Sequence, residues 1–205
     1  MQYPAGGNRW VSIAFETLIK VVADELHGLY KIWGAQTTDA TTAKRLSVLL
    51  TTSKVKSVAA QLAGRLERND AEFDTHPYLL NTINCVVDLR TGATQSHDPV
   101  HLFTKVAGAQ YRSDAQDAAW TQALGAIPAD TIDWLQQRIG QAAIGTIEPQ
   151  GLLLVFHGSG ANGKTTILSG CRDALGDFAM VIPDKVIMAN HNDHTTELTT
   201  LKGAR

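Results

Sequence analysis

The stretch HGSGANGKTT, residues 157–166, constrains the fold of this chain more than any other part of the sequence. An apolar segment, GLLLVF at 151–156, precedes it, and a helical pattern, TTILSGCRDAL at 165–175, follows it. This order predicts a buried strand, a loop that holds phosphate through backbone N–H groups, and a helix. The pattern G-x-x-x-x-G-K-[ST] of such loops is matched by Gly158, Gly163, Lys164 and Thr165.

The chemistry of a phosphate-binding loop assigns a role to each position. The helix that starts near Lys164 adds the positive end of its dipole to the site. We expect Lys164 along the β- and γ-phosphates of ATP, the Thr165 hydroxyl on Mg²⁺, and Asn162 near a phosphate or the attacking water. An ordinary glycine-rich turn is the alternative, which the flanking segments disfavour. The expected nucleotide-binding residues are Gly158, Ser159, Gly160, Ala161, Asn162, Gly163, Lys164, Thr165 and Thr166.

Hydrophobic spacing divides the preceding residues into a helical layer and a β-hairpin. Apolar residues recur every three or four positions from Phe15 to Trp33, and a second helical pattern runs from about Thr42 to Leu66. The run INCVVDL at 83–89, the turn RTG and the segment ATQSH predict a hairpin, and LFTKV at 102–106 predicts a short strand. Helical spacing returns from Trp120 to Ala143.

Composition favours a soluble protein of the cytoplasm and gives no support for nucleic-acid binding through bulk charge. The net charge is −2, and 44% of the residues are hydrophobic. Cys85 and Cys171 lie in unrelated contexts, which indicates a reducing compartment. The N-terminal residues lack the pattern of a secretory signal, and GLLLVF is too short to span a bilayer, so we expect no membrane association.

The most basic segment lies at 44–68, where Glu67 is the only acidic residue. Its side chains are candidates for contacts with DNA phosphates. The alternative, which we favour, is the solvated face of a helix packed through Leu46, Leu62 and Leu66. The candidate DNA contacts are Lys44, Arg45, Lys54 and Lys56.

Four stretches together resemble the superfamily-3 helicases of phage, plasmid and poxvirus primase–helicase proteins. FHGSGANGKTT at 156–166 is similar to their first ATPase motif, which favours Asn before Gly-Lys. FDTHPYLLNTINCVVDLRTGATQSHDP at 73–99, LFTKVAGAQY at 102–111 followed by Trp120, and RIGQAAIGTIEPQGLLLVFHG at 138–158 resemble the domain before that ATPase. Cys85 replaces the usual glycine of one motif. The residues that match this motif are Asn84, Asp88, Leu89, Thr91 and Gly92.

The resemblance covers the chain from about Trp10 onward and implies its architecture. It implies an α+β accessory domain at 1–145, with a helical layer and a β-hairpin. The first β–loop–α unit of an α/β P-loop ATPase of the AAA+-like kind then follows at 146–205. LTTLKGAR at 198–205 resembles the segment that leads into the family's acidic second motif, so we expect a chain truncated before that motif.

The resemblance also implies a function. It is that of the N-terminal portion of an ATP-dependent DNA helicase of a phage, prophage or plasmid. Its cofactors are ATP and Mg²⁺, and its partner is single-stranded or origin DNA. The intact protein is expected to form a homo-oligomeric ring. The acidic motif, the sensor asparagine and the arginine finger have no counterpart here, so we expect weak nucleotide binding and negligible ATP turnover by this chain alone.

Two other classes of function stay open. One is a small, unrelated P-loop NTPase, which needs a substrate lid that the sequence does not show. The other is a non-enzymatic module for assembly or DNA loading, with a vestigial loop. Acidic residues and histidines after the loop are expected at the surface or in a polar loop, not as metal ligands: Asp184, Asp193, Glu197, His191 and His194. Asp74 and Asp88 are expected in structural roles.

Overall fold

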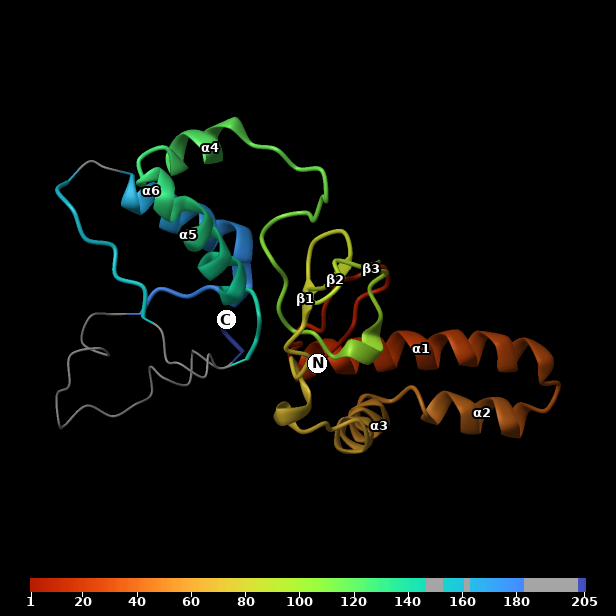
Figure 1. Ribbon diagram of the computed structural model, residues 1–205. Helices are drawn as coiled ribbons and strands as arrows, with labels where there is room; N and C mark the ends of the chain where they lie inside the picture. Colours follow the sequence, from red (N-terminus) through yellow and green to blue (C-terminus); the bar gives the residue numbers. More distant parts are fainter. Residues whose placement is uncertain (147–152, 161–162, 183–202) are drawn as a thin grey trace, which may run out of the picture. The chain divides into compact units, whose positions relative to one another are not determined.

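The chain folds as two units, each with its own interior. The computed structural model describes residues 1–146, 153–160, 163–182 and 203–205 (Figure 1). Unit 1 consists of residues 1–2 and 11–70, and unit 2 consists of residues 3–10 and 71–205. The domain boundary expected at residue 145 stays a prediction, because residues 147–152 lie outside the described ranges.

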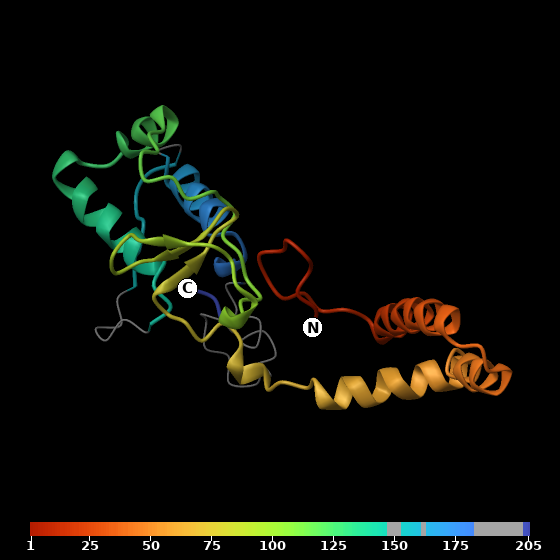
Figure 2. The same cartoon turned by 90° about the vertical axis from the view of Figure 1, so that its right-hand side faces the viewer.

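Unit 1 is the helical layer that the hydrophobic spacing predicts. It contains α1 (Phe15–Gln36), α2 (Ala40–Val48) and α3 (Thr52–Arg65). The second helical pattern of the sequence is therefore two helices, separated at residues 49–51. In Figure 2, α3 (orange) lies beneath α1 (red), and the two helices pack through a core of Val22, Val55 and Ala59.

The start of α2 is fixed by a side-chain cap. Asp39 accepts hydrogen bonds from the backbone N–H groups of Thr41 (3.1 Å) and Thr42 (2.9 Å), and a third from the Thr42 hydroxyl (2.6 Å). These donors satisfy N–H groups that a helix start leaves without partners. They also hold the pKa of Asp39 below its ordinary value, with the Thr42 hydroxyl as the largest cause.

Unit 2 is built around a small antiparallel sheet in the order β1-β2-β3. Its strands are β1 (Leu79–Asn81), β2 (Val86–Asp88) and β3 (Thr94–Gln95), and Val87 pairs with Leu80 on one side and Thr94 on the other. The predicted hairpin is confirmed as β2 and β3, whereas β1 was not expected. With the helices, this sheet gives the chain an α+β arrangement.

The helices of unit 2 lie before the phosphate-loop motif in the sequence and at its end. They are α4 (Ala118–Leu124), α5 (Ala129–Ala142) and α6 (Lys164–Leu175). Short 3₁₀ turns also occur, among them η1 (Asp70–Glu72), η2 (Pro99–His101) and η3 (Gly176–Phe178). Among the described residues, no helix combines the length and the apolar character needed to cross a membrane.

Three expectations about this unit are wrong in detail. The helix predicted from Trp120 to Ala143 is interrupted, because Pro128 disfavours helical backbone before it and cannot donate a helix hydrogen bond. The LFTKV segment is not a strand, since its polar backbone groups are satisfied irregularly, for example by Trp10 N–H donating to the Phe103 carbonyl (2.7 Å). The buried strand predicted at 151–156 is wrong for the part that the structure describes, since residues 153–156 belong to no sheet and Leu153 is 80% exposed. Residues 151–152 lie outside the described ranges.

Two glycines let the chain cross itself closely at the end of α6. Gly176 has φ +55°, and a Cβ there would lie 2.9 Å from the Val106 carbonyl oxygen. A Cβ at Gly108 would collide with the carbonyl oxygen of Asp173. The Gly108 N–H donates to the Ala174 carbonyl (3.0 Å) across this crossing. Only residues without a side chain fit here, so both glycines are required by the packing.

Arg205 closes the interior of unit 2. Its guanidinium lies 4.5 Å from the centre of the Phe178 ring and donates to the carbonyl oxygens of Ala143 (2.8 Å), His76 (3.1 Å) and Leu79 (2.8 Å). Burial lowers the pKa of Arg205 to about 10. A planar group with five fixed donors suits this site, in which two separate segments present three carbonyl oxygens to one side chain.

We expect Gly108→Ala to destabilise unit 2 by about 1–3 kcal/mol, because the added methyl group meets backbone that cannot move aside. The matched control is Gly140→Ala in α5, where no atom lies within 4 Å of the added Cβ. That change should stabilise the helix by about 0.5–1 kcal/mol. Urea unfolding followed by tryptophan fluorescence in a Trp33→Phe background reports unit 2, which contains the other three tryptophans. Equal urea midpoints for Gly108→Ala and Gly140→Ala would contradict the close backbone crossing at Gly108.

We expect α2 to lose helicity as the pH falls below about 4, the ordinary pKa of an aspartate. The folded pKa of Asp39 is lowered, so its contribution to stability is present above the unfolded pKa and is lost as the pH falls through the folded one. Below pH 4, circular dichroism should show a smaller loss of helicity for Asp39→Asn than for the unmodified chain, because asparagine caps the helix without titrating. An identical acid transition for both proteins would exclude this role of Asp39.

Candidate phosphate-binding site

The junction between the loop and α6 is made by a glycine in the left-handed conformation. Gly163 has φ +79° and is the N-cap residue of α6, which begins at Lys164 as the sequence predicts. The Ile167 N–H donates to the Gly163 carbonyl (3.0 Å), and the Ile167 side chain is fully buried. The first turn is therefore anchored on one side while Thr165 and Thr166 remain exposed on the other.

Within the described residues, no side chain caps the N-terminus of α6, because its N-cap residue, Gly163, has no side chain. The first N–H groups of a helix have no partners inside it, and they carry the positive end of its dipole. A phosphate group satisfies both requirements.

Lys164 reaches back across the loop. Its Nζ donates to the carbonyl oxygens of Gly158 (3.1 Å) and Ser159 (3.0 Å). The ammonium group therefore lies where the loop begins, although the residue itself is the first of the helix. A phosphate oxygen is a stronger partner for an ammonium group than a neutral carbonyl oxygen, so an incoming phosphate can compete with the carbonyls of Gly158 and Ser159.

The structure describes seven of the nine expected nucleotide-binding residues. Ala161 and Asn162 lie outside the described ranges, so the shape of the loop between Gly160 and Gly163 stays a prediction. The expected roles of Thr165 at Mg²⁺ and of Lys164 at phosphates also stay predictions. The acidic residues and histidines named after the loop, Asp184, Asp193, Glu197, His191 and His194, are outside the described ranges as well.

The first half of α6 packs against α4. A Cβ at Gly163 would lie 3.3 Å from the Ala126 methyl group, and one at Gly170 would lie 3.4 Å from the Trp120 ring. Trp120 lies on α4. Its contact with a glycine in the middle of a helix shows that the two helices approach closely, and Gly170 was the signal in the sequence for this approach.

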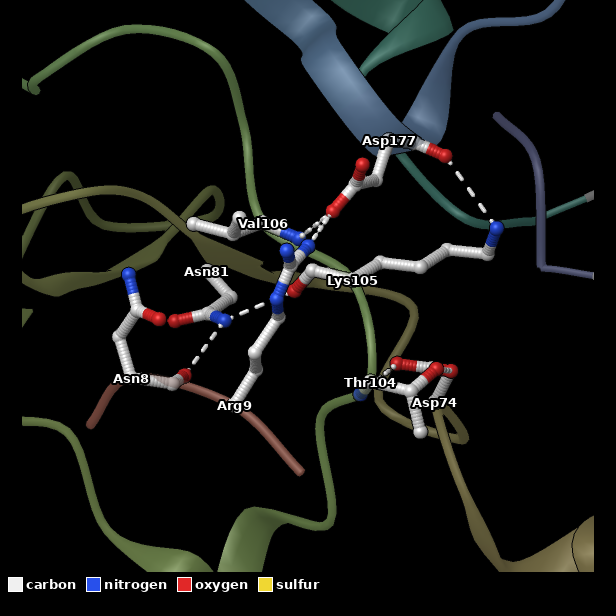
Figure 3. A network of polar contacts seen from close by, with 8 residues as sticks. All are labelled: Asn8, Arg9, Asp74, Asn81, Thr104, Lys105, Val106 and Asp177. Carbon is white, nitrogen blue, oxygen red and sulfur yellow. Dashed lines mark hydrogen bonds and ion pairs between the residues drawn. The ribbon is translucent and has the colours of Figure 1, made fainter. Parts of the chain in front are cut away.

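A polar network holds the far end of α6 (Figure 3). Asp177 forms an ion pair with Arg9 and accepts from the Val106 N–H (3.1 Å), while Lys105 Nζ donates to the Asp177 carbonyl (3.2 Å). The buried Asn81 amide donates to the carbonyls of Asn8 (2.9 Å) and Lys105 (2.8 Å). These residues could not be identified from the sequence, because no local pattern links positions that are far apart in the chain.

Asp74 and Asp88 have the structural roles expected for them. Asp74 accepts from the Thr104 N–H (2.9 Å) and also from the Thr104 hydroxyl. Asp88 accepts from the Arg90 side chain and from the Arg90 N–H (2.9 Å) in the hairpin turn. These bonds, led by the one from the side chain, hold the pKa of Asp88 below its ordinary value.

The candidate DNA contacts lie on two helices of unit 1. Lys44 and Arg45 lie on α2, and Lys54 and Lys56 lie on α3. All four side chains are exposed, and none of them is paired with a carboxylate from the part of the chain that the structure describes. Leu66, expected to pack beneath this face, is 70% exposed, because the helix ends at Arg65 and leaves it at the C-cap.

Comparison with known protein families matches residues 3–128 to the family described as D5 N terminal like. The match covers more than half of the 205 residues and ends between α4 and α5, before the phosphate-loop motif. A search of curated proteins found no match to this chain. The resemblance read from residues 73–111 is thus confirmed for the domain that precedes the loop. The chain belongs to the D5 N-terminal-like family, which is found in replication proteins related to phage and plasmid primase–helicases.

Proposed function

We propose that this chain acts in an ATP-dependent superfamily-3 DNA helicase of phage, prophage or plasmid replication and binds ATP with Mg²⁺ at residues 158–166. The observation that carries the proposal is the position of Lys164. Its ammonium group bridges from the N-terminus of α6 to the carbonyls of Gly158 and Ser159. In a loop with this sequence, the lysine can exchange its hydrogen bonds to carbonyl oxygens for bonds to phosphate oxygens.

The residues of the loop have separate tasks in this proposal. The N–H groups at the start of α6 hold phosphate oxygens, and Gly163 supplies the left-handed backbone that turns the chain into the helix. Lys164 neutralises charge on the phosphates, and the exposed Thr165 hydroxyl is a ligand for Mg²⁺. Bound Mg-ATP supplies the phosphoryl group whose hydrolysis drives unwinding. We place this site in the first β–loop–α unit of an α/β P-loop ATPase of the AAA+-like kind.

We expect this chain alone to bind nucleotide weakly and to release phosphate no faster than background. Hydrolysis needs a second acidic group at the Mg²⁺ ion and a group that neutralises charge on the γ-phosphate. The sequence offers no acidic pair at the end of an apolar strand after residue 165. A homo-oligomeric ring, in which neighbouring copies complete the site, is part of the proposal.

DNA is the proposed partner, and the exposed face of α2 and α3 is the proposed contact. The 27 residues from 40 to 66 contain five basic residues and no acidic one. The four candidate side chains are exposed, so phosphates can reach them without breaking an ion pair described by the structure. This arrangement favours a sequence-independent contact to the backbone of single-stranded or origin DNA.

A second candidate function is a non-enzymatic assembly or loading module with a vestigial loop. The exposure of Leu153 and Val155, 80% and 76%, favours it, because a working loop is normally held by a buried strand. Nucleotide binding separates the two candidates, since the module needs none.

We expect Lys164→Ala to weaken binding of Mg-ATP by about tenfold or more, which corresponds to the loss of hydrogen bonds from a charged group. Isothermal titration calorimetry at millimolar nucleotide measures this. The matched control is Arg172→Ala, which removes a cation from the same helix at a distance from the loop. Unchanged affinity for Lys164→Ala would contradict the proposed site, and absence of binding by the unmodified chain would favour the module.

We expect the double change Lys54→Glu and Lys56→Glu to weaken binding to single-stranded DNA and to flatten its salt dependence. Each lost phosphate contact should reduce the slope of log K against log salt by about 0.7. Fluorescence anisotropy at several salt concentrations measures both effects. Lys20→Glu with Lys31→Glu is the control, because it changes the charge of unit 1 equally at exposed positions on α1. Equal losses for the two double variants would show that only bulk charge matters.

A further inference from the structure

Helix α6 carries the candidate phosphate site at one end, yet residues of the matched family region hold it along its whole length. Its N-cap residue, Gly163, lies near Ala126, its middle lies against Trp120, and its last turn crosses Gly108. Arg9, near the start of the chain, pairs with Asp177 just beyond the helix. The family domain therefore supports this helix and is not merely attached before it.

Asp177 occupies a position at which a carboxylate is unfavourable by itself. The C-terminus of a helix carries partial negative charge, so an acidic group there needs compensation. Two cations supply it, with Arg9 at the carboxylate and Lys105 at the main-chain carbonyl. The carboxylate also accepts from the Val106 N–H (3.1 Å), and the Asp177 N–H donates to the Val106 carbonyl (3.1 Å). The end of α6 is thus fixed in both position and direction.

Because α6 is a single helix, a change in its direction at the C-terminal end also moves its N-terminal end. Twelve residues span about 18 Å. Gly170, near the middle, rests on the Trp120 ring and is the natural pivot. A rotation of about 10° about this point moves the N-terminus by roughly 1.5 Å, a displacement that phosphate hydrogen bonds do not tolerate.

We propose that the Arg9–Asp177 ion pair is the positioning element of the phosphate site, and that it sets nucleotide affinity by fixing the direction of α6. The proposal rests on the proposed nucleotide binding at Lys164. Arg9 and Asp177 touch no phosphate and act through the helix. Arg9 is a positioning residue.

Arg9 lies in a short loop that backbone hydrogen bonds close. Residues 3–10 belong to unit 2. Gln2 and Val11, on either side of them, are joined by two backbone hydrogen bonds of 2.7 and 2.8 Å. This closure restricts the backbone that presents Arg9 to Asp177.

The test compares Arg9→Met, Arg9→Lys and Arg172→Met in the full chain by hydrogen exchange without nucleotide and by calorimetry with Mg-ATP. Arg172→Met is matched, since it breaks an ion pair with Asp173 on the same helix at a solvent-exposed position. We expect Arg9→Met to speed amide exchange at residues 163–168 by about fivefold and to weaken Mg-ATP binding by a similar factor. Arg9→Lys should restore both, and Arg172→Met should change neither.

Each outcome decides a separate point. Unchanged exchange at residues 163–168 in Arg9→Met overturns the positioning role, whether or not nucleotide binds. Faster exchange spread over all of unit 2, or a variant that does not fold, also overturns it, because the pair is then only a general support. If the exchange effect is found but no variant and no unmodified chain binds Mg-ATP, the positioning of α6 stands and the proposed nucleotide function fails.

Discussion

The backbone crossing of Gly108 and Gly176 is the contact on which the rest of unit 2 depends. It brings a segment of the matched family region against the end of α6 at a distance that no side chain would allow. From this crossing the Val106 backbone reaches Asp177, and Asp177 reaches Arg9. The network in Figure 3 is therefore a consequence of two residues that have no side chain.

Local patterns predicted the parts of this fold that short-range forces decide. The spacing of apolar residues located α1 and the two helices after it, and the turn at residues 90–92 located the hairpin. Prediction failed where long-range contacts decide. The LFTKV segment has the composition of a strand, but its backbone is satisfied by Asn81, Trp10 and Asp74 from elsewhere in unit 2. Composition alone could not reveal these partners.

The candidate site shows the same division. The loop motif predicted the start of α6 near Lys164, since it follows from backbone requirements within a few residues. The motif could not predict the contacts among Arg9, Lys105 and Asp177, because these residues come together only when the chain folds. A signal existed in retrospect: an aspartate directly after a helix is electrostatically disfavoured, so it calls for a cation from another part of the chain.

Synthesis delivers the side chain that closes unit 2 late. The residues of unit 1 end at residue 70, whereas the carbonyls of His76, Leu79 and Ala143 accept hydrogen bonds from a guanidinium at residue 205. At about 5–20 residues per second, ribosomal synthesis separates these two points by roughly 7 to 27 seconds. During that interval the three carbonyls lack the side chain that satisfies them in the folded unit.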